Sequence, residues 1–370
     1  MKLLHILLSF VGLGILTACK KSGYEKKNDA VYFKDYWMRS ADCSTFETLN
    51  DVFAKDKHQG YYRGVSIFDT DAASFIALDE YYARDNASVF YCDNYFDFKL
   101  FETNRKDKIM RVARADARSF VAIANKNVYE YAKDKVRGYY KGVGFSVLDL
   151  ASFEPLTYRF GKDKKTGYFD LKPIPGSNGT SFAVLSQNFA KDNQHVYYVW
   201  SLVDGPEPPG IGLVNAADPA SFTVVGRYYA TDKTHAFYKD KALEAADPAS
   251  FRQWAESYTD YALDTTHIYF QEKLITQADR GSFNVLTDYY ARDKKTVFHE
   301  SKPITGCNAG MFQVLELGYA KDGKRVYFNG KVLTSADPVS FALVSNEADR
   351  DAADKTHSYY EGQRIKPEEK

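Results

Sequence analysis

Four histidines share one position relative to an aspartate, and this spacing raises the question of metal binding. Each lies three residues after an Asp, in the pairs Asp192 with His195, Asp232 with His235, Asp264 with His267, and Asp354 with His357. A closed zinc site needs four ligands around one ion. Successive pairs are about 30 or more residues apart, and each supplies only one Asp and one His. The spacing therefore favours a structural role, and we identify no metal ligand.

The same aspartate recurs in units without the histidine. These turn aspartates are Asp56, Asp85, Asp134, Asp163, Asp192, Asp232, Asp264, Asp293, Asp322 and Asp354. A catalytic pair of carboxylates is a single pair within a protein and is not repeated in every unit. An Asp side chain in a tight turn, by contrast, accepts hydrogen bonds from backbone N–H groups two residues further on. The chain also lacks the G-x-S-x-G, H-E-x-x-H, P-loop, G-x-G-x-x-G and EF-hand motifs. We therefore identify no catalytic residue and no cofactor.

The N-terminus carries a chemical signal of a different kind. A basic start precedes an apolar run from Leu3 to Ile15, and Leu-Thr-Ala-Cys follows, ending at Cys19. This order is typical of a secretory signal peptide, and the run is too short to span a membrane. Leu-Thr-Ala-Cys resembles the bacterial lipobox, which implies diacylglycerol on the Cys19 sulfur, cleavage before Cys19 and acylation of the new amino group, for example by palmitate. An ordinary cleaved signal with a free thiol is the alternative.

The lipobox predicts the cellular location. Two or more acyl chains, at about 0.8 kcal/mol per buried methylene, hold a protein stably on a membrane, so we expect a protein anchored in the outer or inner membrane of a bacterial cell envelope. We predict a signal peptide over 1–19, a Lys-rich tether over 20–28, a repeat domain over 29–365 and a tail over 366–370. Lys plus Arg equals Asp plus Glu at 49 each, so we expect no nucleic-acid partner.

The remaining residues repeat at short intervals. Ten repeat phenylalanines follow turn-rich runs such as ADPAS, and five of their nine spacings are 29: Phe46, Phe75, Phe120, Phe153, Phe182, Phe222, Phe251, Phe283, Phe312 and Phe341. Five and six residues after the turn aspartates come two bulky, usually aromatic residues, such as Tyr61-Tyr62. The remaining cysteines, Cys43, Cys92 and Cys307, form no C-x-x-C motif. They are predicted to be small buried hydrophobes, and the sequence does not say whether any two form a disulfide.

Each unit predicts a strand, a turn at Asp, a return strand and a connection. We therefore predict an all-β fold, a tandem array of about ten β-hairpin units of about 29 residues. One hairpin is not stable alone, and its aromatic pair points to both faces, so the units must stack. A propeller-like closed ring, with two hairpins in each four-stranded blade, is our first expectation. An open, curved hairpin solenoid is the alternative.

The motif Asp-Lys-x-x-Val/Ala-Tyr-Tyr resembles the DKNYY family of bacterial repeat proteins, as in Asp192–Tyr198 and Asp354–Tyr360. The resemblance covers nearly all of residues 29–365 and implies an envelope-associated protein with no family active site to carry over. Two units depart from the pattern. Asp293 is followed by Phe298-His299, and Arg111-Val112 replaces the aromatic pair after Asp107. We expect irregular hairpins there.

Two insertions interrupt the period and supply the candidate binding residues. Between Asp192 and Phe222, the segment Val199–Leu213 contains Trp200 and Glu207. Its Pro and Gly content argues against an added strand, so we expect a loop, either a recognition loop or a merely tolerated one. The second insertion is basic and contains Arg105, Lys106, Lys108, Arg111, Arg114 and Arg118. Arg111 and Arg114 are candidates for an anionic partner, with a solvated face as the alternative.

No residues converge on a readable active site, and rigid repeats offer broad surfaces. The leading hypothesis is a non-catalytic envelope lipoprotein that acts as a binding or scaffolding module for a protein or glycan. An envelope hydrolase for glycans or peptides, with a site assembled from several repeats, is one alternative. An immunity-type inhibitor of a periplasmic toxin is another.

Overall fold

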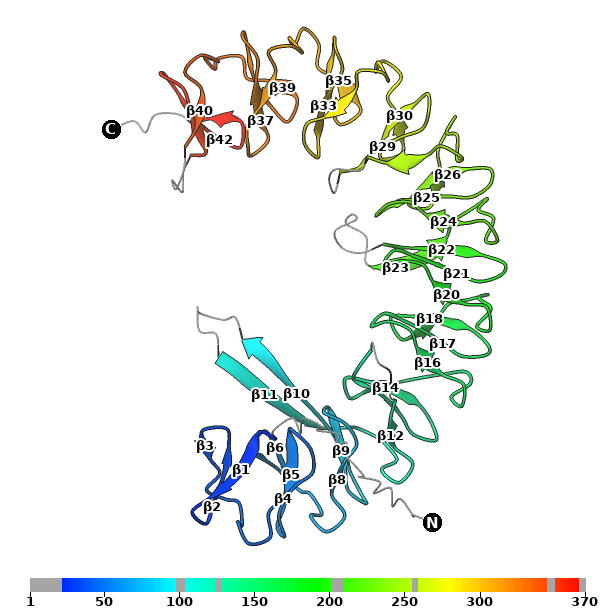
Figure 1. The fold of residues 1–370 in the computed structure, drawn as a ribbon, viewed down its shortest axis with the longest axis vertical. Helices are drawn as coiled ribbons and strands as arrows, with labels where there is room; N and C mark the ends of the chain where they lie inside the picture. The colour runs from blue at the N-terminus through cyan, green and yellow to red at the C-terminus, as the bar shows by residue number, and fades with distance from the viewer. Residues whose placement is uncertain are drawn as a thin grey trace, which may run out of the picture. The chain divides into compact units, whose positions relative to one another are not determined.

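Short antiparallel strands make up the whole of the described structure. The computed structural model describes residues 22–97, 104–123, 125, 128–200, 209–254, 259–344 and 350–365. These residues contain no helix and form eleven sheets in tandem, ten of four strands and one of three (Figure 1). The all-β repeat prediction is confirmed. No barrel closes among these sheets, and their order along the chain is compatible with the open solenoid. Within the described residues, no helix has the length and apolarity needed to cross a bilayer.

The chain divides into two compact units, Met1–Asp163 with Asp170–Lys172, and Lys164–Phe169 with Pro173–Lys370. The first unit contains β1 (Tyr24–Lys27), β2 (Ala30–Phe33), β3 (Tyr36–Trp37), β4 (Glu47–Thr48), β5 (Phe53–Lys55), β6 (Gly60–Tyr62), β7 (Val65–Ile67), β8 (Ile76–Ala77), β9 (Tyr82–Arg84), β10 (Val89–Asp97), β11 (Asn104–Arg111), β12 (Val121–Ala122), β13 (Tyr131–Lys133), β14 (Gly138–Tyr140), β15 (Val143–Phe145), β16 (Glu154–Pro155) and β17 (Phe160–Lys162). β18 (Gly167–Phe169) and β19 (Lys172–Pro173) lie where the units divide.

The second unit contains the remaining strands: β20 (Ala183–Val184), β21 (Phe189–Lys191), β22 (Val196–Trp200), β23 (Gly210–Leu213), β24 (Thr223–Val224), β25 (Tyr229–Thr231), β26 (Ala236–Tyr238), β27 (Lys241–Ala242), β28 (Arg252–Gln253), β29 (Tyr261–Leu263), β30 (Ile268–Phe270), β31 (Lys273–Leu274), β32 (Asn284–Val285), β33 (Tyr290–Arg292), β34 (Val297–His299), β35 (Lys302–Pro303), β36 (Gln313–Val314), β37 (Tyr319–Lys321), β38 (Val326–Phe328), β39 (Lys331–Val332), β40 (Ala342–Leu343), β41 (Ala352–Ala353), β42 (Ser358–Tyr360) and β43 (Gln363–Arg364).

One repeat builds a whole sheet, where the sequence predicted a hairpin contributing half a blade. In the order β24-β25-β26-β27, the predicted hairpin is the central pair β25–β26. The segment after Phe222 pairs with β25, and the segment after Tyr238 pairs with β26. These outer strands are only two residues long, too short to give a sequence signal of their own. The unit with Asp293, expected to be irregular, forms the regular sheet β32–β35.

The first strand lies inside the segment predicted to be a tether. β1 begins at Tyr24, and Tyr24 is buried while Lys26 and Lys27 are exposed. The residues predicted to be a tether therefore include a strand at the edge of the first sheet, with one buried aromatic side chain followed by charged ones. This sheet, β1-β2-β3, has three strands.

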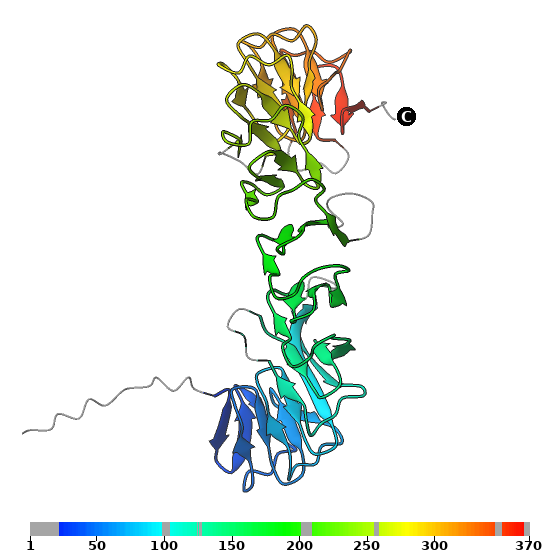
Figure 2. The same ribbon diagram turned by 90° about the vertical axis from the view of Figure 1, so that its right-hand side faces the viewer.

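Eight of the ten repeat phenylalanines pack between their own sheet and the preceding one. The ring centroid of Phe251 lies 5.6 Å from that of Tyr229 on β25 and 5.7 Å from that of Tyr269 on β30. The same pair of contacts occurs at Phe46, Phe75, Phe120, Phe222, Phe283, Phe312 and Phe341. The buried clusters accordingly draw their members from consecutive sheets. Figure 2 shows the resulting side-by-side sheets at the blue and red ends of the chain.

Seven tyrosine hydroxyls each add a polar link from one sheet to the next. The hydroxyl of Tyr261 donates toward the carbonyls of Tyr289 and Glu300, at 3.0 and 2.9 Å. Equivalent bridging tyrosines are Tyr24, Tyr82, Tyr131, Tyr229, Tyr290 and Tyr319. Gly330 donates its N–H to the Tyr290 hydroxyl at 2.9 Å. Its φ of 74° and its close approach to His299 exclude a side chain there.

No disulfide joins the three described cysteines. Cys43, Cys92 and Cys307 are free thiols. Cys92 is fully buried on β10 among Phe53, Tyr62 and Phe90. Burial raises the pKa of the Cys92 thiol, so this cysteine acts as a small apolar side chain.

The intersheet role of the repeat phenylalanines predicts a large stability loss on truncation. Phe251→Ala removes a buried ring from two sheets at once, and we expect the free energy of unfolding to fall by about 3–5 kcal/mol. Urea unfolding checks this value. Val339→Ala, at a side chain 87% exposed, is the control and should change stability by less than about 0.5 kcal/mol. A loss of similar size in both variants would contradict the proposed packing role.

Candidate functional site

The turn aspartates use their carboxylates to hold the scaffold together. In Asp322, Oδ1 accepts the backbone N–H groups of Lys324 and Arg325, both at 2.8 Å. Oδ2 accepts the N–H of Asn308 and the hydroxyl of Tyr327, both at 2.9 Å. Both oxygens of this buried side chain are therefore occupied. Backbone donors occupy both oxygens in the same way at Asp56, Asp85, Asp134, Asp192, Asp232, Asp264, Asp293 and Asp354.

Hydrogen bonds of this kind keep the carboxylate of Asp264 ionised. At Asp264, burial raises the pKa, but the N–H groups of Asp247, His267 and Thr266 outweigh burial and lower the pKa to about 2. The side chain of His267 turns back to its own turn aspartate, with Nδ1 3.1 Å from Oδ2. Among the described residues, no three His, Cys, Asp or Glu side chains are grouped to hold a metal ion. The Asp-x-x-His pairs are thus local contacts within single turns.

The second insertion forms a long hairpin. β10 pairs with β9 only over Val89–Tyr91, and the rest of β10 up to Asp97 pairs with β11 alone. This hairpin is the pair of cyan arrows in Figure 1. Asp107 lies within β11, opposite Asn94, and its Oδ1 lies 3.0 Å from Nε of Arg63. Asp107 therefore does not open a hairpin turn, and the expected departure from the repeat pattern is observed there: the residue is an ion-pair partner within a strand.

A polar cluster fixes the base of the hairpin to the next sheet. The hydroxyl of Tyr91 on β10 donates to Oε1 of Glu130 at 2.7 Å. The other carboxylate oxygen of Glu130 lies 3.5 Å from Nζ of Lys141. Burial and the Glu130 carboxylate together raise the pKa of Tyr91, which stays protonated as a donor. The sequence did not identify Glu130 as a functional residue, because a glutamate that occurs in one repeat only forms no recognisable motif.

Exposed cations and an aromatic side chain lie on the hairpin. Lys106 and Lys108 are exposed on β11, and Tyr95, opposite Lys106, is 48% exposed. The candidate Arg111 ends β11 and is exposed. The candidate Arg114 is also exposed, in the turn after β11 with a φ of 60°, and its carbonyl accepts a hydrogen bond from the next sheet. The structure therefore places both arginines at the base of the hairpin.

The first insertion is partly strand, so the expectation of a pure loop is wrong. β22 runs to Trp200, and Trp200 pairs with Gly210 on β23. A Cβ at Gly210 or Gly212 would meet the Trp200 ring, so the ring lies on β23 where only glycine leaves room. Trp200 is half-buried and packs on the cluster that contains Phe189. Gly210 and Gly212 therefore allow β23 to pair with β22, because a larger side chain at either position would collide with the Trp200 ring. Glu207 lies outside the described residues, as does Cys19.

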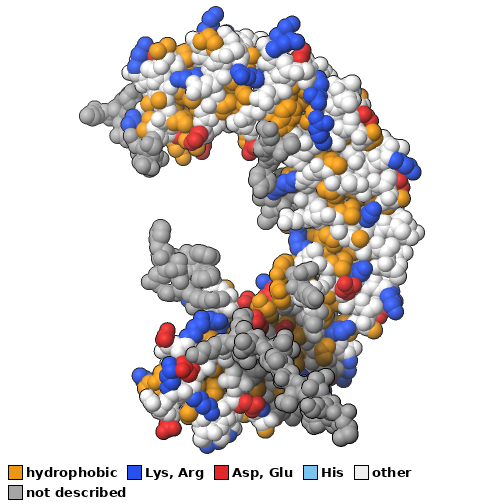
Figure 3. Space-filling model, viewed as in Figure 1, with side chains coloured by type: hydrophobic (Ala, Val, Ile, Leu, Met, Phe, Trp, Pro, Cys, Tyr) orange, Lys and Arg blue, Asp and Glu red, His pale blue; other side chains and the backbone are white. Residues whose placement is uncertain are grey.

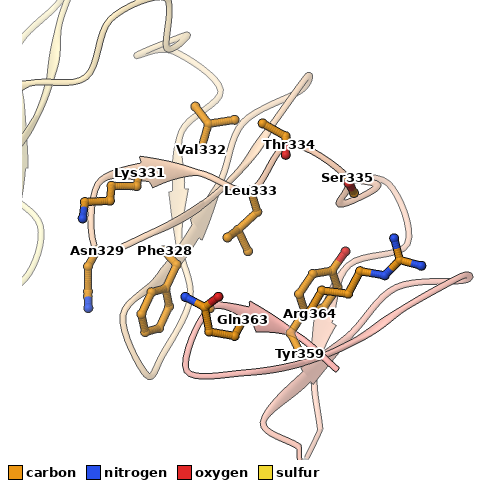
Figure 4. A pocket seen from close by; sticks show the side chains of 11 residues that line it. Phe328, Asn329, Lys331, Val332, Leu333, Thr334, Ser335, Tyr359, Gln363 and Arg364 are labelled. Carbon is orange, nitrogen blue, oxygen red and sulfur yellow. The ribbon is translucent and has the colours of Figure 1, made fainter. Parts of the chain in front are cut away.

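A surface cavity of about 440 Å³ lies between the last two sheets. Figure 4 shows Phe328, Leu333 and Gln363 around a common space, with Arg364 beside Tyr359 and Lys331 directed away. The described residues that line it carry hydroxyl, amide and cationic groups but include no His, Cys, Asp or Glu. Such a set could hold a polar ligand but offers no general base.

The fold and these surfaces define a tandem β-sheet repeat protein with one projecting hairpin. The chain belongs to the DKNYY family, whose model matches residues 8–94, 146–273, 261–310 and 304–363. No curated protein and no solved structure shows significant similarity to it. The matched ranges leave out residues 95–145, so most of the hairpin and the sheet that holds its base lie outside the family pattern.

The depressed pKa of Asp264 predicts a pH dependence of stability. A carboxyl group whose pKa falls from about 3.9 in the unfolded chain to about 2 in the folded one stabilises the protein above its unfolded pKa. That contribution disappears as the pH falls from about 5 to about 2. Urea unfolding across this pH range should show a smaller decline in Asp264→Asn than in the parent. Asp240→Asn, at an exposed side chain, is the control, and equal effects of both substitutions would contradict the assignment.

Proposed function

We propose that this protein is a non-catalytic, lipid-anchored scaffold of the bacterial envelope whose β10–β11 hairpin binds a partner. The observation that carries the proposal is the hairpin itself. Its strands, of nine and eight residues, are the longest among the described residues. The hairpin extends beyond the other strands of its own sheet, and most of it lies outside the ranges that match the family. We therefore attribute to it a task other than building the scaffold.

The fixed base supports a binding role. Glu130 holds Tyr91 at one side, and Arg63 of the preceding sheet holds Asp107 at the other. At the base of the hairpin, Cys92 and Ile109 pack on the buried cluster that contains Phe53 and Tyr62. A rigid element loses little conformational entropy on binding, which favours affinity.

The chemistry of the hairpin supports an anionic partner surface. Lys106, Lys108 and Arg111 present positive charge along β11, and Tyr95 adds an amphipathic ring. Tyr and Arg are enriched in protein interfaces. We therefore propose an acidic protein surface as the partner, presented in the same envelope compartment.

The hydrogen bonds of the turn aspartates and of the histidines that follow them support a non-catalytic role. The turn aspartates accept hydrogen bonds at both oxygens, and the histidines contact their own turns. These groups are already occupied in holding the strands, so they do not offer a free acid or base.

The anchor is tested by replacing the proposed acylation site. Cys19→Ser removes the sulfur that would carry diacylglycerol, so we expect loss of radioactive palmitate labelling and loss of the mature protein from the membrane fraction. The parent protein, labelled and fractionated in parallel, is the control. Undiminished labelling of the serine variant would refute the proposed anchor.

The hairpin is tested by charge reversal. Lys106→Glu combined with Lys108→Glu should lower partner recovery in cross-linking from intact cells at least several-fold, because like charges would then face an acidic surface. Lys273→Glu combined with Lys302→Glu, at exposed positions of β31 and β35, is the matched control. Equal recovery with all three proteins would exclude the hairpin as the binding element.

A further inference from the structure

We propose that the edge strands of the first two sheets dock onto the bilayer that holds the anchor. The contact consists of Tyr36 and Trp37 on β3, with Val65 and the following Phe68 at β7, and we name it the aromatic edge. It rests on the lipid anchor proposed above and adds an orientation: the N-terminal end of the repeat domain lies against the membrane.

The side chains of the aromatic edge are exposed to an unusual degree. Tyr36 is 67% exposed, Trp37 48%, Val65 44% and Phe68 83%. They belong to consecutive sheets, and the hydroxyl of Ser40, in the turn after β3, lies 3.4 Å from that of Ser66 on β7. Figure 3 shows hydrophobic side chains next to Lys and Arg on the surface of these sheets. Grouped apolar side chains on a surface mark an interaction site more often than isolated ones do.

The same repeat positions are polar in four consecutive sheets of the second unit, from β24 to β39. The position of Tyr36 and Val65, opposite the second aromatic of the pair, is occupied there by Lys241, Lys273, Lys302 and Lys331. Three residues on, the position of Phe68 is occupied by Glu244, Thr276, Thr305 and Thr334. The fold therefore tolerates lysine and threonine here, so the scaffold does not require the aromatic side chains of the first two sheets.

The aromatic edge lies close to the proposed anchor. Only four residues separate Cys19 from Tyr24, which begins β1, and a fully extended chain of this length spans at most about 17 Å. Tyr24, Phe33 and Tyr36 are aligned across the sheet, so Tyr36 lies about 10 Å from Tyr24. The N–H of Lys34 also donates to the carbonyl of Gly23 at 2.7 Å, which fixes the start of β3 beside the entering chain. An acylated Cys19 therefore holds the aromatic edge within reach of the headgroups.

The side chains suit a bilayer surface. Trp and Tyr concentrate at membrane–water interfaces, where the ring lies among the headgroups. The guanidinium carbon of Arg39 lies 5.0 Å from the centroid of the Trp37 ring, and Lys34 is exposed next to Tyr36. Both cations can meet lipid phosphates while the rings enter the interface. These positions favour a lipid surface over a protein partner, because the anchor alone already confines the edge to the membrane.

Fluorescence of Trp37 tests the contact. The chain has three Trp residues, so Trp200→Phe with Trp254→Phe leaves Trp37 as the reporter. The full-length lipidated protein is reconstituted in vesicles of phosphatidylethanolamine and phosphatidylglycerol, with or without bromine on the acyl chains. We expect Trp37 emission to shift to the blue and to be quenched by the brominated lipid. A protein that retains only Trp254, which packs against Phe283, should be quenched several-fold less.

A second variant separates the contact from the fold. In the Trp37-only protein, Tyr36→Lys combined with Phe68→Thr introduces the residues that other repeats carry, so the domain should unfold at an unchanged urea concentration. Its Trp37 quenching should drop to that of the Trp254 control. Equal quenching before and after the substitutions would show that lipid reaches Trp37 without the aromatic edge, and would overturn the proposal.

Two further outcomes distinguish this inference from the proposed anchor. If palmitate labelling and flotation show a lipidated, vesicle-bound protein but Trp37 is not quenched, the anchor stands and the docking proposal fails. Trp37 emission that shifts to the blue in the brominated vesicles without being quenched would instead identify a contact between protein molecules at this edge, and would also overturn the proposal. Absence of palmitate from the parent protein would refute the anchor itself.

Discussion

The packing of one phenylalanine between two consecutive sheets is the interaction on which the rest of the structure depends. Most strands are two or three residues long, and sheets of this size are not stable in isolation. Phe251 and its equivalents supply the missing apolar contact, because each ring touches an aromatic of its own sheet and one of the preceding sheet. Stability therefore belongs to pairs of neighbours, as in other repeat proteins.

Polar side chains set the spacing that this packing needs. The turn aspartates join each connection to a turn of the same sheet, and the bridging tyrosines reach the next one. In the last described sheet, β40–β43, Asp351 lies at the position of Tyr319 and Ala353 at that of Lys321. Asp351 accepts the hydroxyl of Tyr319 at 2.7 Å and offers no hydroxyl outward.

The functional proposals rest on departures from the repeat. Glu130 and the long strands β10 and β11 occur once, as does the aromatic edge in place of a lysine row. Within a repeat, a side chain that recurs serves the scaffold. A side chain that occurs in one repeat only has no such general role. Where it is exposed, or holds a projecting element, it is available for binding.

The sequence by itself determined the all-β repeat, its period and the role of the turn aspartates, because these depend on local turn chemistry and on the spacing of aromatics. Only the tertiary structure decided that one repeat makes a four-stranded sheet, since strands such as β24 and β27 have two residues and form through pairing alone. It likewise decided that glycines beside Trp200 form a strand and that Asp107 pairs with Arg63. Partners 44 residues apart are brought together by stacking, and no local pattern encodes that distance.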